Sequence, residues 1–97
     1  CISIGNLVGA SLTSGTGNVF IGNNVGTLAT SGANNVGIGH SAMSTGNISG
    51  IGNIALGNES MLKLALGNNN TAIGTNTMKE LVSGSDNVAI GNNAYLI

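Results

Sequence analysis

The chain has 97 residues, including 17 Gly and no Pro or Trp, and only 5% of them are charged, for a formal net charge of -1. Two lysines are too few for the basic patch that binds nucleic-acid phosphates or an anionic membrane surface, so both partners are excluded. No apolar run is long enough to span a membrane as a helix, and we expect no membrane insertion. A hydrophobic content of 41% predicts a packed structure with a thin aliphatic core.

An Ile-Gly pair recurs along the whole chain. The pairs begin at Ile4, Ile21, Ile38, Ile51, Ile73 and Ile90, with spacings of 17, 17, 13, 22 and 17 residues. A fixed period in this range indicates a solenoid, in which each repeat forms one coil. The two uneven spacings together span about two regular steps, which predicts one short coil followed by one long coil.

Each Ile is expected to end a short strand. Two residues before it stands a β-branched residue in most repeats, as in Val19, Val36 and Val88, and alternate residues of a strand share one face. We therefore predict that these residues point inward. The predicted repeat core comprises Ile4, Val19, Ile21, Val36, Ile38, Ile51, Ile73, Val88 and Ile90.

The predicted fold is all-β, a parallel β-solenoid or β-roll of about six coils with repeats of about 17 residues, forming a single segment over residues 1–97. The sequence has no Asn-Gly dipeptide, the strongest hairpin signal, so parallel stacking is favoured. A glycine follows each Ile where a turn is needed. The predicted turn glycines are Gly22, Gly39, Gly52, Gly74 and Gly91.

Asparagines stand three residues before several of these isoleucines, at Asn18, Asn35, Asn70 and Asn87. Coils stacked about 4.8 Å apart would place these amides over one another, and they could then form hydrogen-bonded ladders. A second group fits a ladder or an ordinary turn role equally well. That group is Asn23, Asn24, Asn92 and Asn93.

Residues 57–66 depart from the pattern and are expected to form an irregular insert or loop. Glu59 and Lys63 lie four residues apart there, which suits one helical turn or a bulging loop. The single cysteine, Cys1, allows no internal disulfide and is compatible with a processed N-terminus or a segment boundary. No capping unit is visible at either end, so we expect a window from a longer fibre.

The sequence predicts no catalytic, cofactor-binding or metal-binding residues, and we expect no enzyme and no cofactor. His40 and Ser41 are adjacent, but on a strand such neighbours point to opposite faces, and no acidic residue is expected nearby. Calcium-binding β-rolls need an Asp in every repeat, whereas Asp86 is alone. No Gly-rich stretch has the spacing of a nucleotide-binding loop.

Two segments carry a family resemblance, Asn70-Thr71-Ala72-Ile73-Gly74 and residues 85–94, which read SDNVAIGNNA. They resemble the NxAIGxxA repeats of bacteriophage tail fibres and are also similar to the head repeats of trimeric autotransporter adhesins. The resemblance covers most of the chain and is poor over 53–66. It implies a homotrimer of side-by-side or intertwined rolls.

Two functions remain open. The first is a structural segment of a phage tail fibre in the virion, a rigid spacer that presents a host-attachment tip, through which the fibre would reach a cell-surface receptor or glycan. The alternative is an adhesin head on the bacterial surface that binds host matrix or glycan itself. Ice binding is excluded because Thr13, Thr27, Thr30, Thr45 and Thr71 occupy different repeat positions and form no row.

Overall fold

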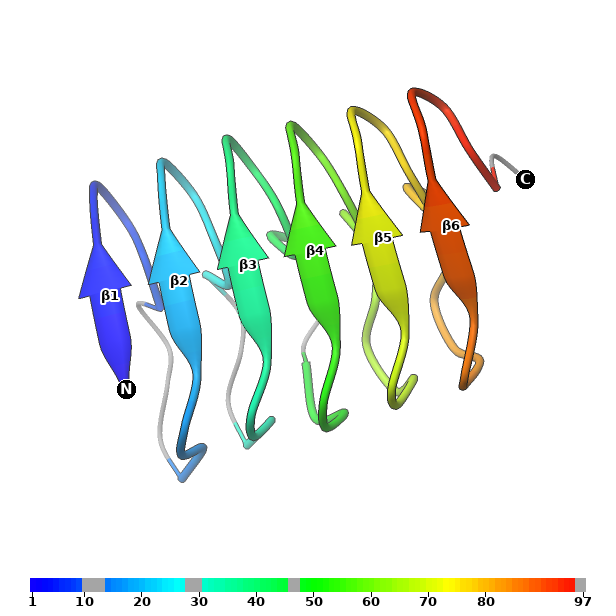
Figure 1. Cartoon of the computed structure of the whole chain (residues 1–97). Coiled ribbons are helices and arrows are strands. Elements are labelled where there is room, and N and C mark those ends of the chain that lie inside the picture. The colour runs from blue at the N-terminus through cyan, green and yellow to red at the C-terminus, as the bar shows by residue number, and fades with distance from the viewer. Residues whose placement is uncertain (10–13, 28–30, 46–47, 96–97) are drawn as a thin grey trace.

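The computed structural model describes residues 1–9, 14–27, 31–45 and 48–95, and it is an all-β parallel solenoid. Six three-residue strands form one sheet in chain order, with about five turns between the first and the last. All six arrows point the same way and lie side by side (Figure 1). They are β1 (Ile2–Ile4), β2 (Val19–Ile21), β3 (Val36–Ile38), β4 (Ile54–Leu56), β5 (Thr71–Ile73) and β6 (Val88–Ile90).

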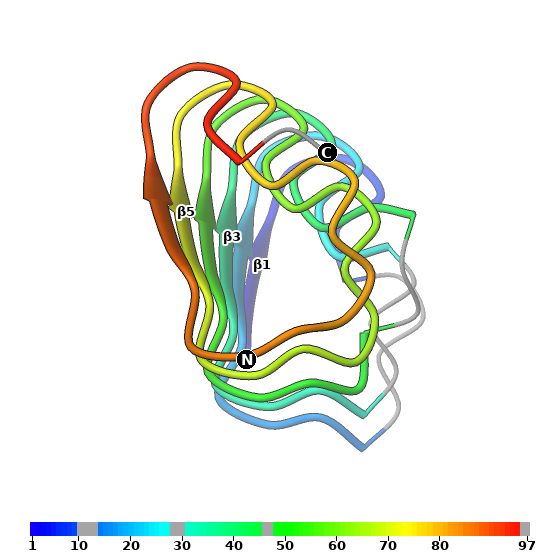
Figure 2. The ribbon, with the colours of Figure 1, turned by 90° about the vertical axis from the view of Figure 1, so that its right-hand side faces the viewer.

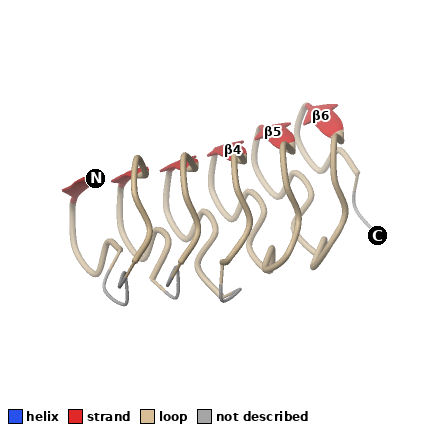
Figure 3. Ribbon diagram, turned by 90° about the horizontal axis from the view of Figure 1, so that it is seen from below, coloured by secondary structure: helices blue, strands red, loops and turns tan. Residues whose placement is uncertain are grey.

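Each coil has its strand on one side and returns through turns on the other (Figure 2). Seen from below, the strands line one edge of the stack (Figure 3). No helix lies among the described residues. The predicted fold class is thereby confirmed for the single chain.

The fourth strand begins five residues later than the Ile-Gly pattern predicted, at Ile54 instead of Ser49. Val36 pairs with Ile54, a step of 18 residues, whereas every other strand pair has a step of 17. Ile51 lies outside the strands, in an isolated bridge to Ala33, and is 50% exposed. The prediction of one short and one long coil was therefore wrong, and so was the place of Ile51 in the core.

The turn glycine that follows the fourth strand is Gly57 rather than Gly52. Gly22, Gly39, Gly57, Gly74 and Gly91 directly follow their strands with φ between 124° and 136°, a region in which only glycine is comfortable. The Cβ that a substitution would add to Gly57 would lie 2.5 Å from the carbonyl oxygen of Gly74 in the next coil. Gly52 has a φ of 75° and lies at the corner before the strand.

Residues 57–66 follow the same course as residues 74–83 and are not an insert. Ser60 N donates to Gly57 O and Leu64 N to Met61 O, and the later coil repeats the second bond between Leu81 and Met78. Ser60, Met61 and Leu64 are fully buried in this segment. The expected irregular loop is thus a regular coil with an unusual sequence.

The side chains of each strand point the opposite way from the prediction. The central residue is buried in the five strands from β2 to β6, and its neighbours are half-buried or exposed. Val88 is 69% exposed and Ile90 is 67% exposed, whereas Ala89 between them is 8% exposed. The Val and Ile pairs therefore share a face as predicted, but it is the outside of the solenoid.

The core lies between the central strand residues and the turns opposite. Its large members are Phe20, Val25, Met43, Ile48, Met61, Leu64 and Met78, all fully buried. Three methionines recur at the same place in successive coils, each with a left-handed φ of 49° to 53°. From β3 to β6 the central strand residue is Gly or Ala, because the large side chains of the turns opposite reach across the core to it. No room remains there for the Val and Ile side chains of the strand.

A column of asparagines runs beside the core and confirms the predicted ladder. Asn53 is typical, because its Nδ2 donates to Gly67 O at 2.8 Å and its Oδ1 accepts from Asn70 N at 3.0 Å. The asparagines at positions 18, 35, 53 and 70 thus bond the next coil through both ends of the amide, and Asn87 Nδ2 donates back to Asn70 Oδ1. The column is Asn18, Asn35, Asn53, Asn70 and Asn87. By contrast, Asn24 and Asn93 are turn residues with left-handed φ.

Candidate interaction surface

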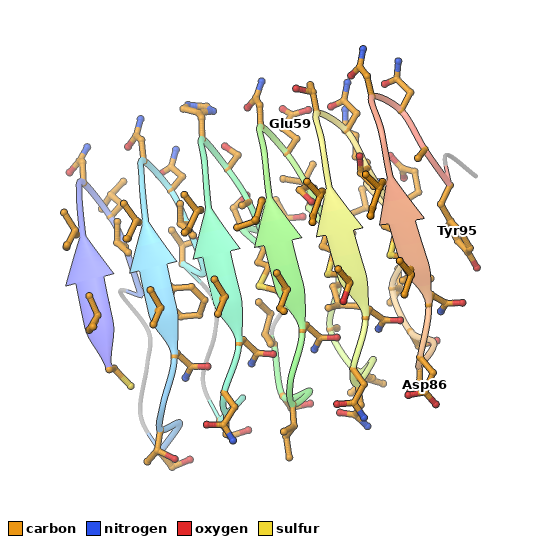
Figure 4. The ribbon with its side chains drawn as sticks, in the orientation of Figure 1. Glu59, Asp86 and Tyr95 are labelled. Atoms are coloured by element: carbon orange, nitrogen blue, oxygen red, sulfur yellow. The ribbon has the colours of Figure 1, made fainter. Side chains whose placement is uncertain are left out.

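The outward side chains of the six strands form one continuous surface, which we call the outer face (Figure 4). Two rows of side chains run along it, and each strand contributes one residue to each row. The first row is Ile2, Val19, Val36, Ile54, Thr71 and Val88. The second row is Ile4, Ile21, Ile38, Leu56, Ile73 and Ile90.

The outer face is apolar and accessible. Ile38 and Ile54, in the middle of the sheet, are 37% and 36% exposed although neighbouring coils lie on both sides. With strands about 4.8 Å apart and alternate side chains about 7 Å apart, the two rows cover on the order of 300 Å². Contiguous apolar patches of this size on a monomer are often sites of interaction. The outer face is therefore the candidate site of this chain.

No charged side chain lies on the outer face. Four of the five charged residues of the chain form two ion pairs between the fourth and fifth coils. Lys63 Nζ lies 2.7 Å from Glu80 Oε1, and Lys79 Nζ lies 2.9 Å from Glu59 Oε1. Glu59 lies at the turn that follows the strand, and Asp86 lies at the opposite corner of the coil (Figure 4). The charged side chains thus lie in the turns and corners of the coils, and none lies on the strands.

The ion pairs join successive coils, not residues of one turn. Glu59 and Lys63, which lie four residues apart in one coil, each pair with a residue of the next coil. The hydrogen bond from Lys63 is the main cause that lowers the pKa of the Glu80 carboxyl below its ordinary value. Both pairs are solvent-accessible, so each contributes little to stability.

His40 and Ser41 are in contact, contrary to the expectation from a strand. They lie in the turn after β3, and Ser41 Oγ is 3.2 Å from His40 Nδ1. Glu59 lies in the equivalent turn of the next coil, where its backbone N–H donates to His40 O, and its carboxylate is paired with Lys79. His40 is exposed and Ser41 is half-buried. The contact is therefore a surface hydrogen bond without the third group that a catalytic triad needs.

Three further observations concern the part of the chain that the structure describes. It contains no pocket and no group of three or more His, Cys, Asp or Glu side chains that could hold a metal ion. None of its segments is a helix of the length and apolar character needed to cross a membrane. Cys1 is a free, exposed thiol.

The chain matches no protein-family model, no curated protein and no solved structure.

The sequence indicated eight of the twelve residues of the outer face but assigned their side chains to the core. The four that it did not include are Ile2, Ile54, Leu56 and Thr71. One signal could have corrected this assignment. The residue five positions after each strand is Gly26 where the strand centre is Phe20, and it is Met43 where the centre is Gly37. This exchange of large and small residues identifies the central strand position as the inward one.

Proposed function

We propose that this chain is a structural segment of an extracellular fibre, and that copies of it associate through the outer face. The observation that carries the proposal is an uncharged sheet surface, aliphatic except for Thr71, that is half-buried or exposed along the stack. In its middle, Ile38 is 37% and Ile54 is 36% exposed. Such a surface is stabilised when another apolar surface covers it.

A rod with one apolar side suits a shaft better than a binding head. Each coil adds one pair of outward side chains, so the contact between copies grows in proportion to the number of coils. The outer face of this segment alone is smaller than the roughly 800 Å² per partner of a stable protein interface. We therefore expect association of the isolated segment to be weak and strongly dependent on concentration.

The resemblance to phage tail-fibre repeats supports a shaft in the virion that carries a host-attachment tip, and it suggests three copies per fibre. The test is sedimentation equilibrium of the 97-residue chain from micromolar to millimolar concentration. A mass that rises toward a small closed oligomer supports the proposal. A folded monomer over the whole range contradicts it.

One observation favours the alternative, an adhesin head on a bacterial surface. A ridge of exposed side chains follows the strands, two residues beyond each strand end, and most of them are amides that could bond to sugar hydroxyls. The ridge is Asn6, Asn23, His40, Asn58, Thr75 and Asn92. Binding of the chain to a glycan array, lost in Asn58→Ala, would support this function. If the chain binds no glycan, the adhesin proposal fails and the fibre shaft remains.

A further inference from the structure

The two rows of the outer face differ in the size of their side chains (Figure 4). The second row consists of isoleucines and Leu56, so each of its side chains is a butyl group. The first row is shorter by one heavy atom at four of its six positions, which are Val19, Val36, Thr71 and Val88. The outer face therefore has a shallow edge and a deep edge along the whole stack.

The handedness of the chain limits how two outer faces can meet. In every copy, the strand direction, the solenoid axis and the outward direction of the face have one fixed relation, which no rotation inverts. When two copies face each other with parallel axes, their strands run in opposite directions, and the first row of each lies over the second row of the other. When the axes are antiparallel, the strands run in the same direction, and like rows lie over each other.

Antiparallel axes would make the contact uneven. The two second rows would set butyl groups against butyl groups at every coil, whereas the two first rows would bring shorter side chains together. Sheets that pack face to face lie about 10 Å apart, with side chains packed as densely as in a protein interior. The longer side chains would hold the sheets apart along one edge and leave a space of roughly one methylene per contact along the other.

Parallel axes would make the contact even. Each shorter side chain of the first row would then meet a butyl group of the second row, as Val36 would meet Ile38 at the level of β3. This compensation depends on the row and not on the coil, so it holds for any number of overlapping coils. Parallel axes also direct all copies the same way, as a shaft with a tip at one end requires.

We propose that copies of this chain associate with parallel solenoid axes, and that the first row of one copy packs against the second row of the next. This inference rests on the proposed association through the outer face. The same contact forms in a two-fold pair and in a closed ring of three copies, because in both each copy turns its first row toward the second row of a neighbour.

The test is disulfide cross-linking between single-cysteine chains in a Cys1→Ser background. Val88→Cys places a thiol in the first row of β6, Ile90→Cys one in the second row of β6 and Ile2→Cys one in the first row of β1, at positions that are 69%, 67% and 53% exposed. Parallel copies join Val88→Cys to Ile90→Cys. Antiparallel copies that overlap fully join Val88→Cys to Ile2→Cys, and antiparallel copies that meet at β6 alone join Val88→Cys to itself.

Each pair of chains is mixed in equal amounts under a glutathione redox buffer, with one chain isotope-labelled so that mass spectrometry separates the products. We expect the product of Val88→Cys with Ile90→Cys to exceed each of the other two by roughly tenfold, as for two unfilled methylenes. If Val88→Cys couples preferentially to Ile2→Cys or to itself, the axes are antiparallel and the proposal is overturned.

A second variant tests whether the sizes of the rows set the direction. Val19→Ile with Val36→Ile, carried by every cysteine chain, makes the rows nearly equal, so the preference for the parallel product should fall severalfold. Ile21→Leu with Ile38→Leu changes the same two coils but keeps butyl groups, and it should leave the preference as it was. An unchanged preference in the first variant overturns the role of row size, whereas a chain that sediments as a monomer and forms no cross-links contradicts the association itself.

Discussion

The ring of Phe20 fills the space beside Gly26, where the Cβ of any other residue would come within 2.8 Å of two ring atoms. The next coil reverses this arrangement, because Gly37 stands at the centre of its strand and Met43 reaches toward it, with Sδ 3.5 Å from the place of a Cβ. Each of these two coils thus places one large side chain between its strand and the turn opposite. In the first coil it comes from the strand, and in the next coil it comes from the turn.

Exchanging the large residue across the core tests this complementarity. We expect Phe20→Ala to lower the free energy of unfolding by about 3–5 kcal/mol through the cavity it leaves. Gly26→Met alone should overpack the core and also be destabilising. The double variant reproduces the pattern of the following coil, so its loss should be smaller than the two single losses together, with a coupling of about 1–3 kcal/mol.

Urea unfolding followed by circular dichroism measures all three variants. Strictly additive losses would show that Phe20 and Gly26 do not share one space. The left-handed backbone at Gly26, with a φ of 56°, is not an obstacle in principle, because Met43 adopts a φ of 52° at the equivalent position.

The asparagine column is expected to be essential to the stack. In Asn53→Ala, the carbonyl of Gly67 and the amide N–H of Asn70 lose their partners inside the protein. Buried groups without a partner should lower the free energy of unfolding by on the order of 3 kcal/mol. Asn58→Ala changes the same residue type at an exposed turn and should alter it by less than about 0.5 kcal/mol. Similar losses for both variants would refute a structural role of the column.

The parallel fold and most of its register could be predicted from the sequence, because isoleucines, glycines and asparagines all recur with a period of about 17 residues. The fourth strand could not be located from the Ile-Gly pair alone, since Ile51-Gly52 imitates the pattern. The column asparagine would have located it, because Asn53 stands three residues before Leu56, whereas Ile48 stands three before Ile51.

The direction of the side chains could not be predicted from alternation. Alternation states that Val36 and Ile38 share a face, but it does not state which face is buried. Burying the most apolar residues is the ordinary expectation, and it fails here because methionines and Phe20 already fill the narrow interior. The candidate site was missed for the same reason, since its residues had been assigned to the core.

The ion pair between Lys63 and Glu80 predicts a small dependence of stability on pH. The lowered pKa of Glu80 in the folded protein means that its contribution is present above the pKa of the unfolded chain. That contribution disappears as the pH falls through the lowered folded-state pKa. The melting temperature of the parent chain should therefore exceed that of Glu80→Gln at neutral pH and low salt, and the difference should vanish in acid.

High salt provides the control for this pair, because screening weakens an exposed ion pair. The difference between the parent chain and Glu80→Gln should shrink at neutral pH when salt is added. A difference that persists in both acid and high salt would mean that the substitution acts through packing.

Two aspartate substitutions separate the inside of the sheet from its outer face. Ala72 is fully buried, so Ala72→Asp would place a charge in the core without a partner and should prevent folding, at a cost of several kcal/mol. Ile38 is 37% exposed on the outer face, so Ile38→Asp should leave the melting temperature of the dilute monomer nearly unchanged. At high concentration the same charge should abolish self-association, because it would be buried between copies.

His40→Ala is the matched control, since His40 is also exposed but lies off the outer face in the following turn. It should affect neither the melting temperature nor the mass at high concentration. Circular dichroism and sedimentation equilibrium on the three variants give the two quantities separately. If Ile38→Asp unfolds the dilute chain as completely as Ala72→Asp does, then Ile38 belongs to the interior and the outer face does not exist. If it folds and still associates like His40→Ala, the copies meet through another surface.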